Sequence, residues 1–398
     1  MSKLNIKERI IGTFGGEAEG PTVVCIGGLH GNEPAGVLAL RRVLDQLEKN
    51  KTPFRGRLIA VAGNLRALER GVRFIDQDLN RIWRPGDMDK LMSGGNAASA
   101  TDAEEAERRD LINVFVQSCS KKRSPVYFLD LHTTSSVGSP FITIADTLRN
   151  RAFALKYPVP IILGIEERLD STLLNYINEL GYIAVGFEAG QHDDPDSIEN
   201  CVAALWITLV NAGCIDNADS EQLEKNFSKL KLAARGEYGI YEVRYRHGIE
   251  DDGGFLMEPG FRNFQRIKKG DLLASSGGRE IKSQENGNIF MPLYQKQGVD
   301  GFFVIKKINP AWLNISAFLR KLHLESVLTS LPGVQGVRGQ YDTIIVNENI
   351  ARWYVIDFLH LLGYRRKTLE NGKLIARKRA FDIKSPEDYS LSLKSINV

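Results

Sequence analysis

Residues 22–33 read TVVCIGGLHGNE, and this stretch decides how the first part of the chain folds. The β-branched apolar run from Thr22 to Ile26 is typical of a buried strand, and the glycines after it allow a tight turn. Apolar residues at helical spacing between Pro34 and Lys49 then predict a helix. Strand, turn and helix in this order form the repeating unit of an α/β sheet.

The same alternation continues to about residue 225. Apolar runs typical of strands recur at 58–61, 126–129, 141–144, 160–163 and 182–187. Helical spacing recurs between them, at 103–118, 171–180 and 198–210. Because hairpin signals are few, we predict an α/β domain over 1–225, built on a mainly parallel or mixed twisted sheet flanked by helices.

The rest of the chain has different patterns. From Gly236 onward, alternating residues and paired glycines predict a small β domain over 236–310. Two amphipathic helices, 312–324 and 350–362, and two strand-like runs predict an α+β extension over 311–398, whose role the sequence does not indicate. The segment 85–101 is rich in Pro, Gly, Ser, Asn and Ala, so it is either a lid or a disordered insertion.

Composition excludes several classes of protein. No apolar run approaches the roughly 20 residues of a membrane span, and the N-terminal residues lack a secretory pattern, so we expect a cytoplasmic protein without a membrane partner. Four scattered cysteines argue against a disulfide scaffold or a thiolate zinc site, and we interpret them as reduced, mostly buried thiols. A net charge of +3, with basic residues interleaved with acids in the tail, argues against nucleic-acid binding. The sequence leaves homo-oligomerisation open.

The first candidate site lies directly after the first strand. His30 and Glu33 could turn toward one point there, although such a pair is also typical of a surface histidine and a capping glutamate. A second strand ends in Asp130-Leu131-His132, and neighbouring strands lie only about 4.8 Å apart. His30, Glu33 and His132 would therefore hold one zinc ion per chain with a coordination position open, which is the catalytic pattern. Asp130 either orients a ligand imidazole or caps backbone amides.

A third strand carries Glu188 near its end. A carboxylate on an apolar strand is costly unless it is paired or functional, so Glu188 is a candidate general base; the alternative is a solvent-exposed strand-end residue. We interpret His192 as a surface or rim residue. Between the ligand segments, Asn80 and Arg81 offer donors that fit a carboxylate, unless Arg81 merely pairs with a nearby aspartate, Asp76 or Asp78.

Taken together, these motifs resemble the succinylglutamate desuccinylase and aspartoacylase family, relatives of the zinc carboxypeptidases. The likeness rests on Gly28–Glu33, Asp78–Arg81, Asp130–Thr133 and Glu188, in that order, and covers roughly residues 20–305. It implies a carboxypeptidase-like fold, and zinc bound by His30, Glu33 and His132, with Glu188 as general base. It also implies that Arg73 polarises the scissile carbonyl, that Asn80 and Arg81 hold the substrate carboxylate, and that the β domain narrows the channel.

The resemblance predicts a zinc-dependent hydrolase that cleaves the amide bond of a small N-acyl amino acid. Two departures limit it: relatives acting on N-acetylaspartate carry an arginine ten residues before the catalytic glutamate, where this chain has Asn178, and the segment from Ala311 onward has no counterpart. The same metal set would serve a carboxypeptidase or a peptide amidase. A non-catalytic metal-binding regulatory protein is a third hypothesis, but it would have no need of a positioned base.

Overall fold

The structure, a computed structural model, describes most of the chain up to residue 322 and parts of the remainder. The described residues are 6, 8–84, 102–119, 125–169, 171–216, 220–249, 254–322, 328–330, 332–337, 340–347, 359, 361–370, 373–378 and 381–384. The segment 85–101, for which a lid or an insertion was predicted, lies outside them, as does most of the predicted helix 350–362.

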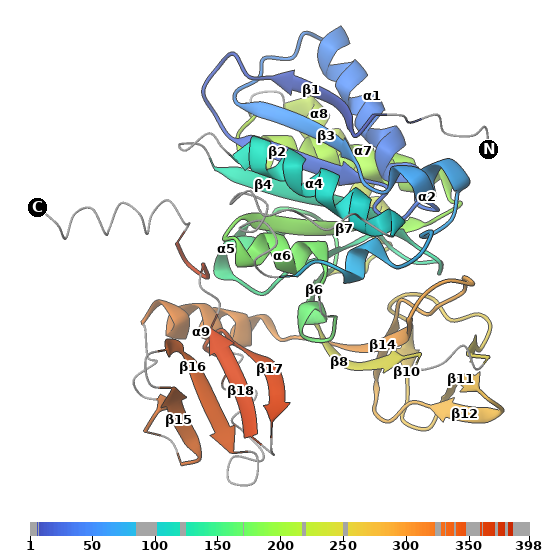
Figure 1. Cartoon of the computed structure of the whole chain (residues 1–398), viewed down its shortest axis with the longest axis vertical. Helices are drawn as coiled ribbons and strands as arrows, with labels where there is room; N and C mark the ends of the chain where they lie inside the picture. The colour runs from blue at the N-terminus through green and yellow to red at the C-terminus, as the bar shows by residue number, and fades with distance from the viewer. Residues whose placement is uncertain are drawn as a thin grey trace, which may run out of the picture.

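One large mixed sheet organises the molecule (Figure 1). From edge to edge its strands are β1 (Ile10–Gly15), β3 (Arg57–Ala62), β2 (Thr22–Gly27), β4 (Val126–Thr134), β7 (Ile183–Gln191), β5 (Phe141–Thr143), β6 (Ile161–Leu163), β8 (Ile240–Gly248), β14 (Asp300–Lys307), β13 (Gly287–Phe290) and β10 (Arg266–Ile267). The four strands β3, β2, β4 and β7 are parallel, while β1 and β5 run antiparallel to their neighbours β3 and β7. The predicted mixed α/β architecture is confirmed.

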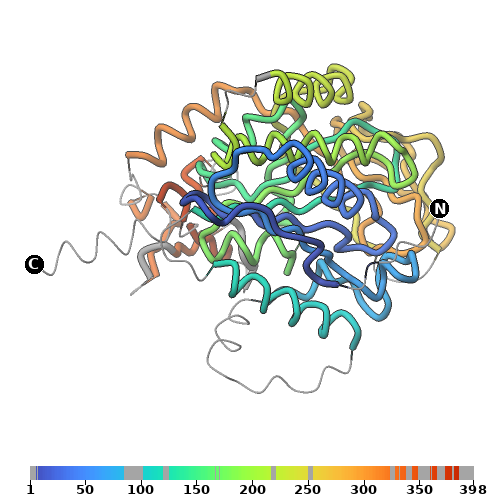
Figure 2. The backbone as a smooth tube through the Cα atoms, turned by 90° about the horizontal axis from the view of Figure 1, so that it is seen from above, coloured from blue at the N-terminus to red at the C-terminus, as the bar shows by residue number. Residues whose placement is uncertain are grey.

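Helices cover both faces of the sheet. The helices and 3₁₀ turns of this part are α1 (Ala35–Lys49), α2 (Leu65–Arg70), η1 (Leu79–Arg81), α4 (Ala103–Cys119), α5 (Leu148–Ala154), η2 (Ile165–Glu167), α6 (Leu173–Glu179), α7 (Pro195–Ala212) and α8 (Ser220–Ala233). Figure 2 shows α7 and α8 on the opposite side of the sheet from α4. The position of β2 between two helix layers explains why its sequence is continuously apolar. Val23 and Cys25 pack with α1 and α7, whereas Val24 and Ile26 pack with α4 and α6.

The sheet continues into the β-rich part of the chain. Strand β8 pairs in parallel with β6, and β14, β13 and β10 follow it with antiparallel pairing, so one ladder crosses the predicted boundary near residue 236. Beyond it, a small three-stranded sheet consists of β9 (Leu256–Met257), β11 (Leu272–Ser276) and β12 (Arg279–Lys282). We call residues 240–307 the β lobe; it lies at the lower right of Figure 1.

The C-terminal extension forms a lobe of its own at the lower left of Figure 1. It consists of α9 (Pro310–Lys321) and a four-stranded antiparallel sheet of β15 (Val334–Val337), β16 (Gln340–Asn347), β18 (Lys373–Lys378) and β17 (Tyr364–Glu370). Asn309 caps α9 by accepting a hydrogen bond from the Ala311 amide, and Pro310 occupies the first turn, where its missing N–H costs nothing.

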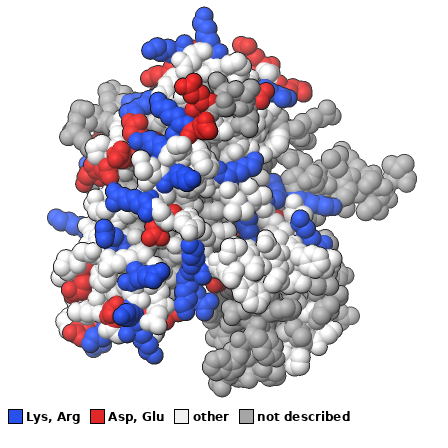
Figure 3. Space-filling model, turned by 180° about the vertical axis from the view of Figure 1, so that it is seen from behind, with Lys and Arg blue, Asp and Glu red and all other residues white. Residues whose placement is uncertain are grey.

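The surface and the cysteines agree with the composition. Among the described residues, no helix is long and apolar enough to cross a membrane. On the face drawn in Figure 3, lysine and arginine side chains are interleaved with acidic ones. The prediction of mostly buried thiols is confirmed: Cys25, Cys201 and Cys214 are buried and Cys119 is partly exposed.

Candidate active site

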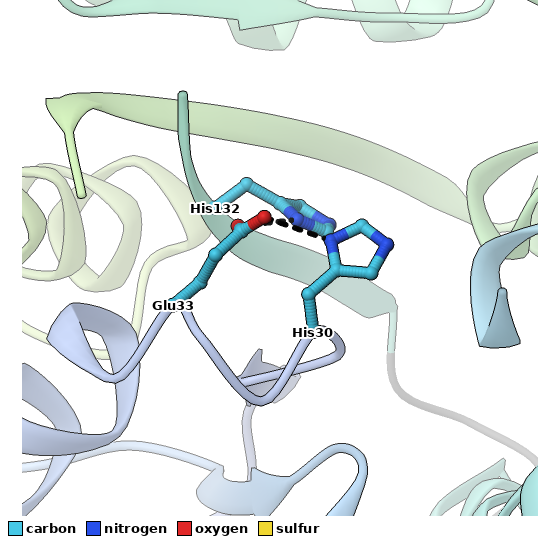
Figure 4. A group of neighbouring side chains, drawn as sticks. All are labelled: His30, Glu33 and His132. Carbon is cyan, nitrogen blue, oxygen red and sulfur yellow. Dashed lines mark hydrogen bonds and ion pairs between the residues drawn. The ribbon is translucent and has the colours of Figure 1, made fainter. Parts of the chain in front are cut away.

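The site lies where strands β2 and β4 end. The two strands pair in parallel with Gly27 opposite Leu131, so the loop after β2 and the last residues of β4 meet at one edge of the sheet. That loop carries His30 and Glu33, and β4 carries His132; the three side chains converge in Figure 4.

A glycine makes the loop's tight path feasible. A Cβ atom on Gly31 would lie 2.0 Å from the carbonyl carbon of Ala67, so any larger residue would push the loop away from α2. The Gly31 amide also donates to the Arg73 carbonyl over 3.2 Å, which ties the loop that carries His30 and Glu33 to the segment before η1. The glycine-rich sequence therefore holds His30 and Glu33 at a fixed height above the sheet.

The geometry of the three side chains is that of a metal site. The Nδ1 atom of His30 lies 2.9 Å from Glu33 Oε1, and the Nδ1 atom of His132 lies 3.1 Å from Glu33 Oε2. One ligand atom from each residue lies within 4.8 Å of the others, and all three residues are buried. Two imidazole nitrogens and one carboxylate oxygen suit a divalent transition metal ion, so the residues present fit a metal centre. The alternative of a surface histidine with a capping glutamate is wrong.

Each histidine is oriented from behind by a carboxylate. His30 Nε2 lies 3.0 Å from Asp78 Oδ1, and His132 Nε2 lies 2.8 Å from Asp130 Oδ2. Carboxylates in this position fix the imidazole ring and direct its other nitrogen toward the metal. Asp130 lies where the first of its two predicted roles would place it, behind the His132 imidazole.

The buried groups of the site stabilise the charged forms of Glu33 and His132. Burial disfavours the Glu33 carboxylate, but His30 and His132 outweigh it and hold its pKa well below the ordinary value. Burial likewise disfavours charged His132, but Asp130 and Glu33 outweigh it and hold its pKa well above the ordinary value. The Thr133 amide adds a hydrogen bond to Glu33 Oε2 over 2.9 Å. Glu33 is therefore held by two imidazole nitrogens and one backbone amide.

Glu188 is buried like these groups, but its neighbours stabilise its negative charge only weakly. It lies on β7 directly opposite His132 in the parallel register of β4 and β7. Its residue is only 8% exposed, and its Oε2 atom has no hydrogen-bond partner among the described residues. Burial, opposed in part by His132, raises its pKa to about 8. The alternative of a solvent-exposed strand-end glutamate is wrong.

Arg73 faces the same centre. Its Nε and Nη2 atoms donate to Asp78 Oδ2 over 3.2 and 3.0 Å, and its Nη1 atom lies 3.4 Å from Glu33 Oε1. These partners orient the guanidinium toward the candidate metal ligands, beside which the head of a substrate would lie.

Asn80 and Arg81 come from η1 on the cavity wall. Arg81 Nη2 donates to Asp300 Oδ2 over 2.6 Å, so the aspartate that the Arg81 side chain hydrogen-bonds is neither Asp76 nor Asp78, the two partners given in the alternative to carboxylate binding. Asp300 also accepts a 2.6 Å hydrogen bond from Arg246 Nε, so two guanidinium groups share one carboxylate and leave a net positive charge. The side-chain oxygen of Asn80 accepts from the Leu173 amide, which leaves its NH₂ group to face a ligand.

One cavity contains all these groups. His30, Glu33, Arg73, Asn80, Arg81, His132, Glu188 and His192 line it together. Its other side is largely apolar and is formed by Ile144, Ala145, Ile165, Leu169, Leu174, Met291, Leu293, Val299 and Phe303. The last four belong to the β lobe, which thus forms one wall of the cavity. His192 is a rim residue that joins Thr133 to Gln295 by hydrogen bonds of 2.7 and 3.1 Å.

The sequence did not indicate Gln295 or Asp300 as residues of the site, and it indicated Asp78 only as an alternative partner of Arg81 and as part of a motif. Asp78 stands in the motif with Asn80 and Arg81, so its position was a usable signal. Gln295, which accepts from Asn32 over 2.9 Å, and Asp300 lie more than 200 residues from the loops they contact. Nothing in their local sequence marks them, because their role arises only from the pairing of distant strands.

A second acidic group consists of Asp76, Asp102 and Glu104, whose carboxylates accept hydrogen bonds from backbone amides. Both oxygens of buried Glu104 accept hydrogen bonds from the amides of residues 75–77, at 2.8 to 3.2 Å. These contacts anchor the segment that leads to Asp78, which gives Glu104 a structural role without a metal.

The mixed sheet and the position of the site define the class: the chain has the carboxypeptidase-like α/β fold. A sequence model of the succinylglutamate desuccinylase/aspartoacylase catalytic domain matches residues 19–199, so this part of the chain is assigned to that family. The predicted family and fold are confirmed.

Individual relatives are distant. The N-acyl-aromatic-L-amino acid amidohydrolase (carboxylate-forming) of Xenopus laevis is 26% identical, over 63% of this chain and 84% of its own length. A succinylglutamate desuccinylase of a Shewanella strain is 25% identical, over 69% of this chain and 79% of its own. These relatives are hydrolases of N-acyl amino acids and differ from each other in the substrate they are named for.

Solved structures support the fold. A succinylglutamate desuccinylase/aspartoacylase from Rhodobacter sphaeroides aligns with a TM-score of 0.51 at 17% identity, covering 73% of this chain and 87% of its own. The ectoine utilization protein EutE (DoeB) from Ruegeria pomeroyi, in a product-bound structure, aligns with a TM-score of 0.51 at 19% identity, covering 73% and 86%.

Proposed function

We propose that this chain is a zinc-dependent hydrolase that cleaves the amide bond of a small N-acyl amino acid carrying a free carboxylate. The observation that carries the proposal is the position of Glu188. A buried carboxylate with an unpartnered oxygen lies in register with His132, beside a His₂Glu donor set that leaves room for substrate. That combination is typical of a catalytic rather than a structural zinc site.

His30, Glu33 and His132 would hold the ion, and Asp78 and Asp130 would keep the two imidazoles oriented. A bound zinc ion supplies Lewis acidity at the scissile carbonyl and lowers the pKa of water. Glu188 accepts the proton of the attacking water and then donates it to the leaving nitrogen. Arg73 donates hydrogen bonds to the oxygen on which negative charge develops.

The far end of the cavity would select the substrate. Asn80 offers its NH₂ group, and Arg81 with Arg246 carries one more positive charge than Asp300 neutralises. A single carboxylate therefore fits this end. The apolar wall then faces the acyl group or the amino-acid side chain, which favours N-acyl derivatives of apolar amino acids.

The second candidate is a carboxypeptidase or peptide amidase with the same metal set. It differs in the length of substrate that the cavity must admit, and the β-lobe wall, with Leu293 and Val299, favours small substrates. A non-catalytic regulatory protein is the third candidate, and the buried, weakly compensated Glu188 argues against it.

A substrate screen with the zinc-loaded protein tests the proposal. N-acetyl, N-formyl and N-succinyl derivatives of phenylalanine, methionine, aspartate and glutamate would be compared with dipeptides and with N-acyl amino-acid amides. Hydrolysis of N-acyl amino acids, with little action on dipeptides, is the expected result. Preferential release of C-terminal residues from dipeptides would instead identify a carboxypeptidase, and no turnover by the zinc-loaded protein would reject an enzyme of this class.

A further inference from the structure

We propose that the C-terminal extension is a brace for the substrate cavity and that Arg320 is the positioning residue through which it acts. For the effect on substrate, this inference rests on the function proposed above. The extension begins after β14, the last strand of the β lobe, and none of those of its residues that the structure describes lines the cavity. Its influence must therefore pass through the residues that it contacts.

Arg320, on α9, is completely buried where the extension meets the α/β part of the chain. Its Nη2 atom donates to Asp146 Oδ2 over 2.8 Å, and its Nη1 atom donates to the Asp146 carbonyl over 3.0 Å. The same Nη1 atom lies 3.2 Å from Asp382 Oδ1, and Nε donates to the Leu361 carbonyl over 3.2 Å. One guanidinium thus joins three separate segments of the chain.

Asp146 is the α/β partner in this cluster. It is also held by Arg151, whose Nη2 atom donates to Asp146 Oδ2 over 2.8 Å. Asp382, from the extension, accepts the Leu148 amide over 2.9 Å with its Oδ1 atom, and its carbonyl accepts the Arg149 amide over 3.3 Å. The start of α5 is therefore joined to the extension by two hydrogen bonds, both to Asp382.

The segment held in this way leads directly into the cavity. Residues 143–145 line it and immediately precede Asp146, so a shift of Asp146 moves the apolar wall. A second contact acts in the same direction: β17 lies against η2, and η2 contributes Ile165 to the same wall. Both contacts reach residues of the apolar side of the cavity, and neither includes His30, Glu33 or His132.

The packing around Arg320 leaves it little freedom. A Cβ atom on Gly363 would lie 3.2 Å from Arg320 Nε and from Asp382 Oδ2, and Gly363 has a φ of +84° that favours glycine. On the same helix, Leu313 packs against the core formed by α1 and α7. A rigid cluster of charges in a well-packed junction transmits a displacement instead of absorbing it.

The test compares Arg320→Met, which keeps the length of the side chain without its charge or donors, with Lys321→Met on the same helix as the control. Lys321 is exposed. Hydrogen–deuterium exchange would be followed in peptides covering 141–154, well below the melting temperature of each zinc-loaded variant. KM and kcat would be measured with N-acetyl-L-phenylalanine, and zinc content on the same preparations.

We expect Arg320→Met to accelerate exchange in 144–151 and to raise KM by about threefold or more, with zinc content and kcat close to those of the parent. Arg320→Lys should fall between the two, because it keeps the charge without the planar fork. Lys321→Met should match the parent. Unchanged exchange and KM in folded Arg320→Met would overturn the proposal, and so would loss of zinc together with an unchanged KM.

A replacement variant and a measurement that does not depend on turnover complete the test. If Arg320→Met does not fold, Asp382→Asn replaces it, since this change removes one anionic partner of Arg320 at nearly constant shape. If N-acetyl-L-phenylalanine is not hydrolysed, the exchange measurement decides alone. Faster exchange limited to 144–151 would then support the brace although the proposed function had failed, and unchanged exchange would reject it.

Discussion

His30 is held between two carboxylates: its Nε2 atom lies 3.0 Å from Asp78 Oδ1, while its Nδ1 atom faces Glu33. Asp78 in turn binds Arg73, so one aspartate fixes both a candidate metal ligand and the candidate oxyanion donor. Under the proposed function, Asp78 would couple metal binding to carbonyl polarisation.

Asp78→Asn should therefore weaken zinc binding without abolishing it. Loss of a carboxylate behind a histidine ligand typically lowers metal affinity about 10–100-fold. Competition with a chromophoric chelator would measure the change. Asp76→Asn is the matched control, since Asp76 lies in the same segment and is exposed. Its side chain accepts a hydrogen bond from the Ala103 amide, at the start of α4. Equal affinities for the two variants would contradict the role of Asp78.

His132→Ala should lose most of the metal. The remaining His30 and Glu33 come from a single loop, and two ligands do not hold a zinc ion tightly. Elemental analysis should give close to one zinc per chain for the parent and a small fraction of that for the variant. His192→Ala, on the cavity rim, serves as the control and should keep its zinc; a zinc-free parent after supplementation would refute the site.

Glu188→Gln should separate chemistry from binding. The amide keeps the shape of the side chain but cannot take a proton from water at neutral pH. We expect kcat to fall by about 10²–10⁴-fold, with KM little changed and zinc retained. Zinc content and kcat measured on one preparation would check this. Retained zinc with full kcat would show that another group is the base.

The pH dependence of Glu188 gives a separate prediction. In the metal-free protein its pKa is raised to about 8, so the carboxylate form is lost as pH falls through that value. A cation bound nearby stabilises the carboxylate and lowers this pKa. Infrared titration of the parent minus Glu188→Gln should show a carboxyl group titrating near 8 without metal and at lower pH with zinc. In the zinc enzyme kcat/KM should rise with pH along a limb below about 8. A titration curve unchanged by zinc would contradict this.

Arg81→Met should weaken the binding of substrates with a free carboxylate. A hydrogen bond to a charged group contributes about 1.5–3 kcal/mol, so KM should rise about tenfold or more. The parent should prefer an N-acyl amino acid to its α-amide, and Arg81→Met should lose most of that preference. Steady-state kinetics with the acid and amide pair would measure it. Equal rates for the two substrates in the parent would reject a carboxylate role for Arg81.

The part of the site that lies at strand ends could be predicted from the sequence. His30, Glu33, His132 and Glu188 each follow or end a buried apolar run, and parallel strands bring such ends to one edge. The fold could also be predicted, because alternating strands and helices up to residue 225 are typical of an α/β sheet.

What the sequence did not indicate depends on contacts between distant segments. The partner of Arg81 is Asp300, from the first residue of β14, and no local pattern distinguishes it from the nearer Asp76 and Asp78. Arg320 is one basic residue among many in a basic tail, and only the folded chain buries it against Asp146. Choosing between such partners requires the three-dimensional register of the sheet.

The parallel pairing of β6 with β8 has a mechanical consequence. It makes the α/β part and the β lobe one hydrogen-bonded ladder, so paired strands join the two walls of the cavity. A hinge that swings them apart would have to break that ladder. Substrates should therefore enter by rearrangement of side chains and short loops at the mouth, and a crosslink between the two walls away from the mouth should leave turnover unimpeded.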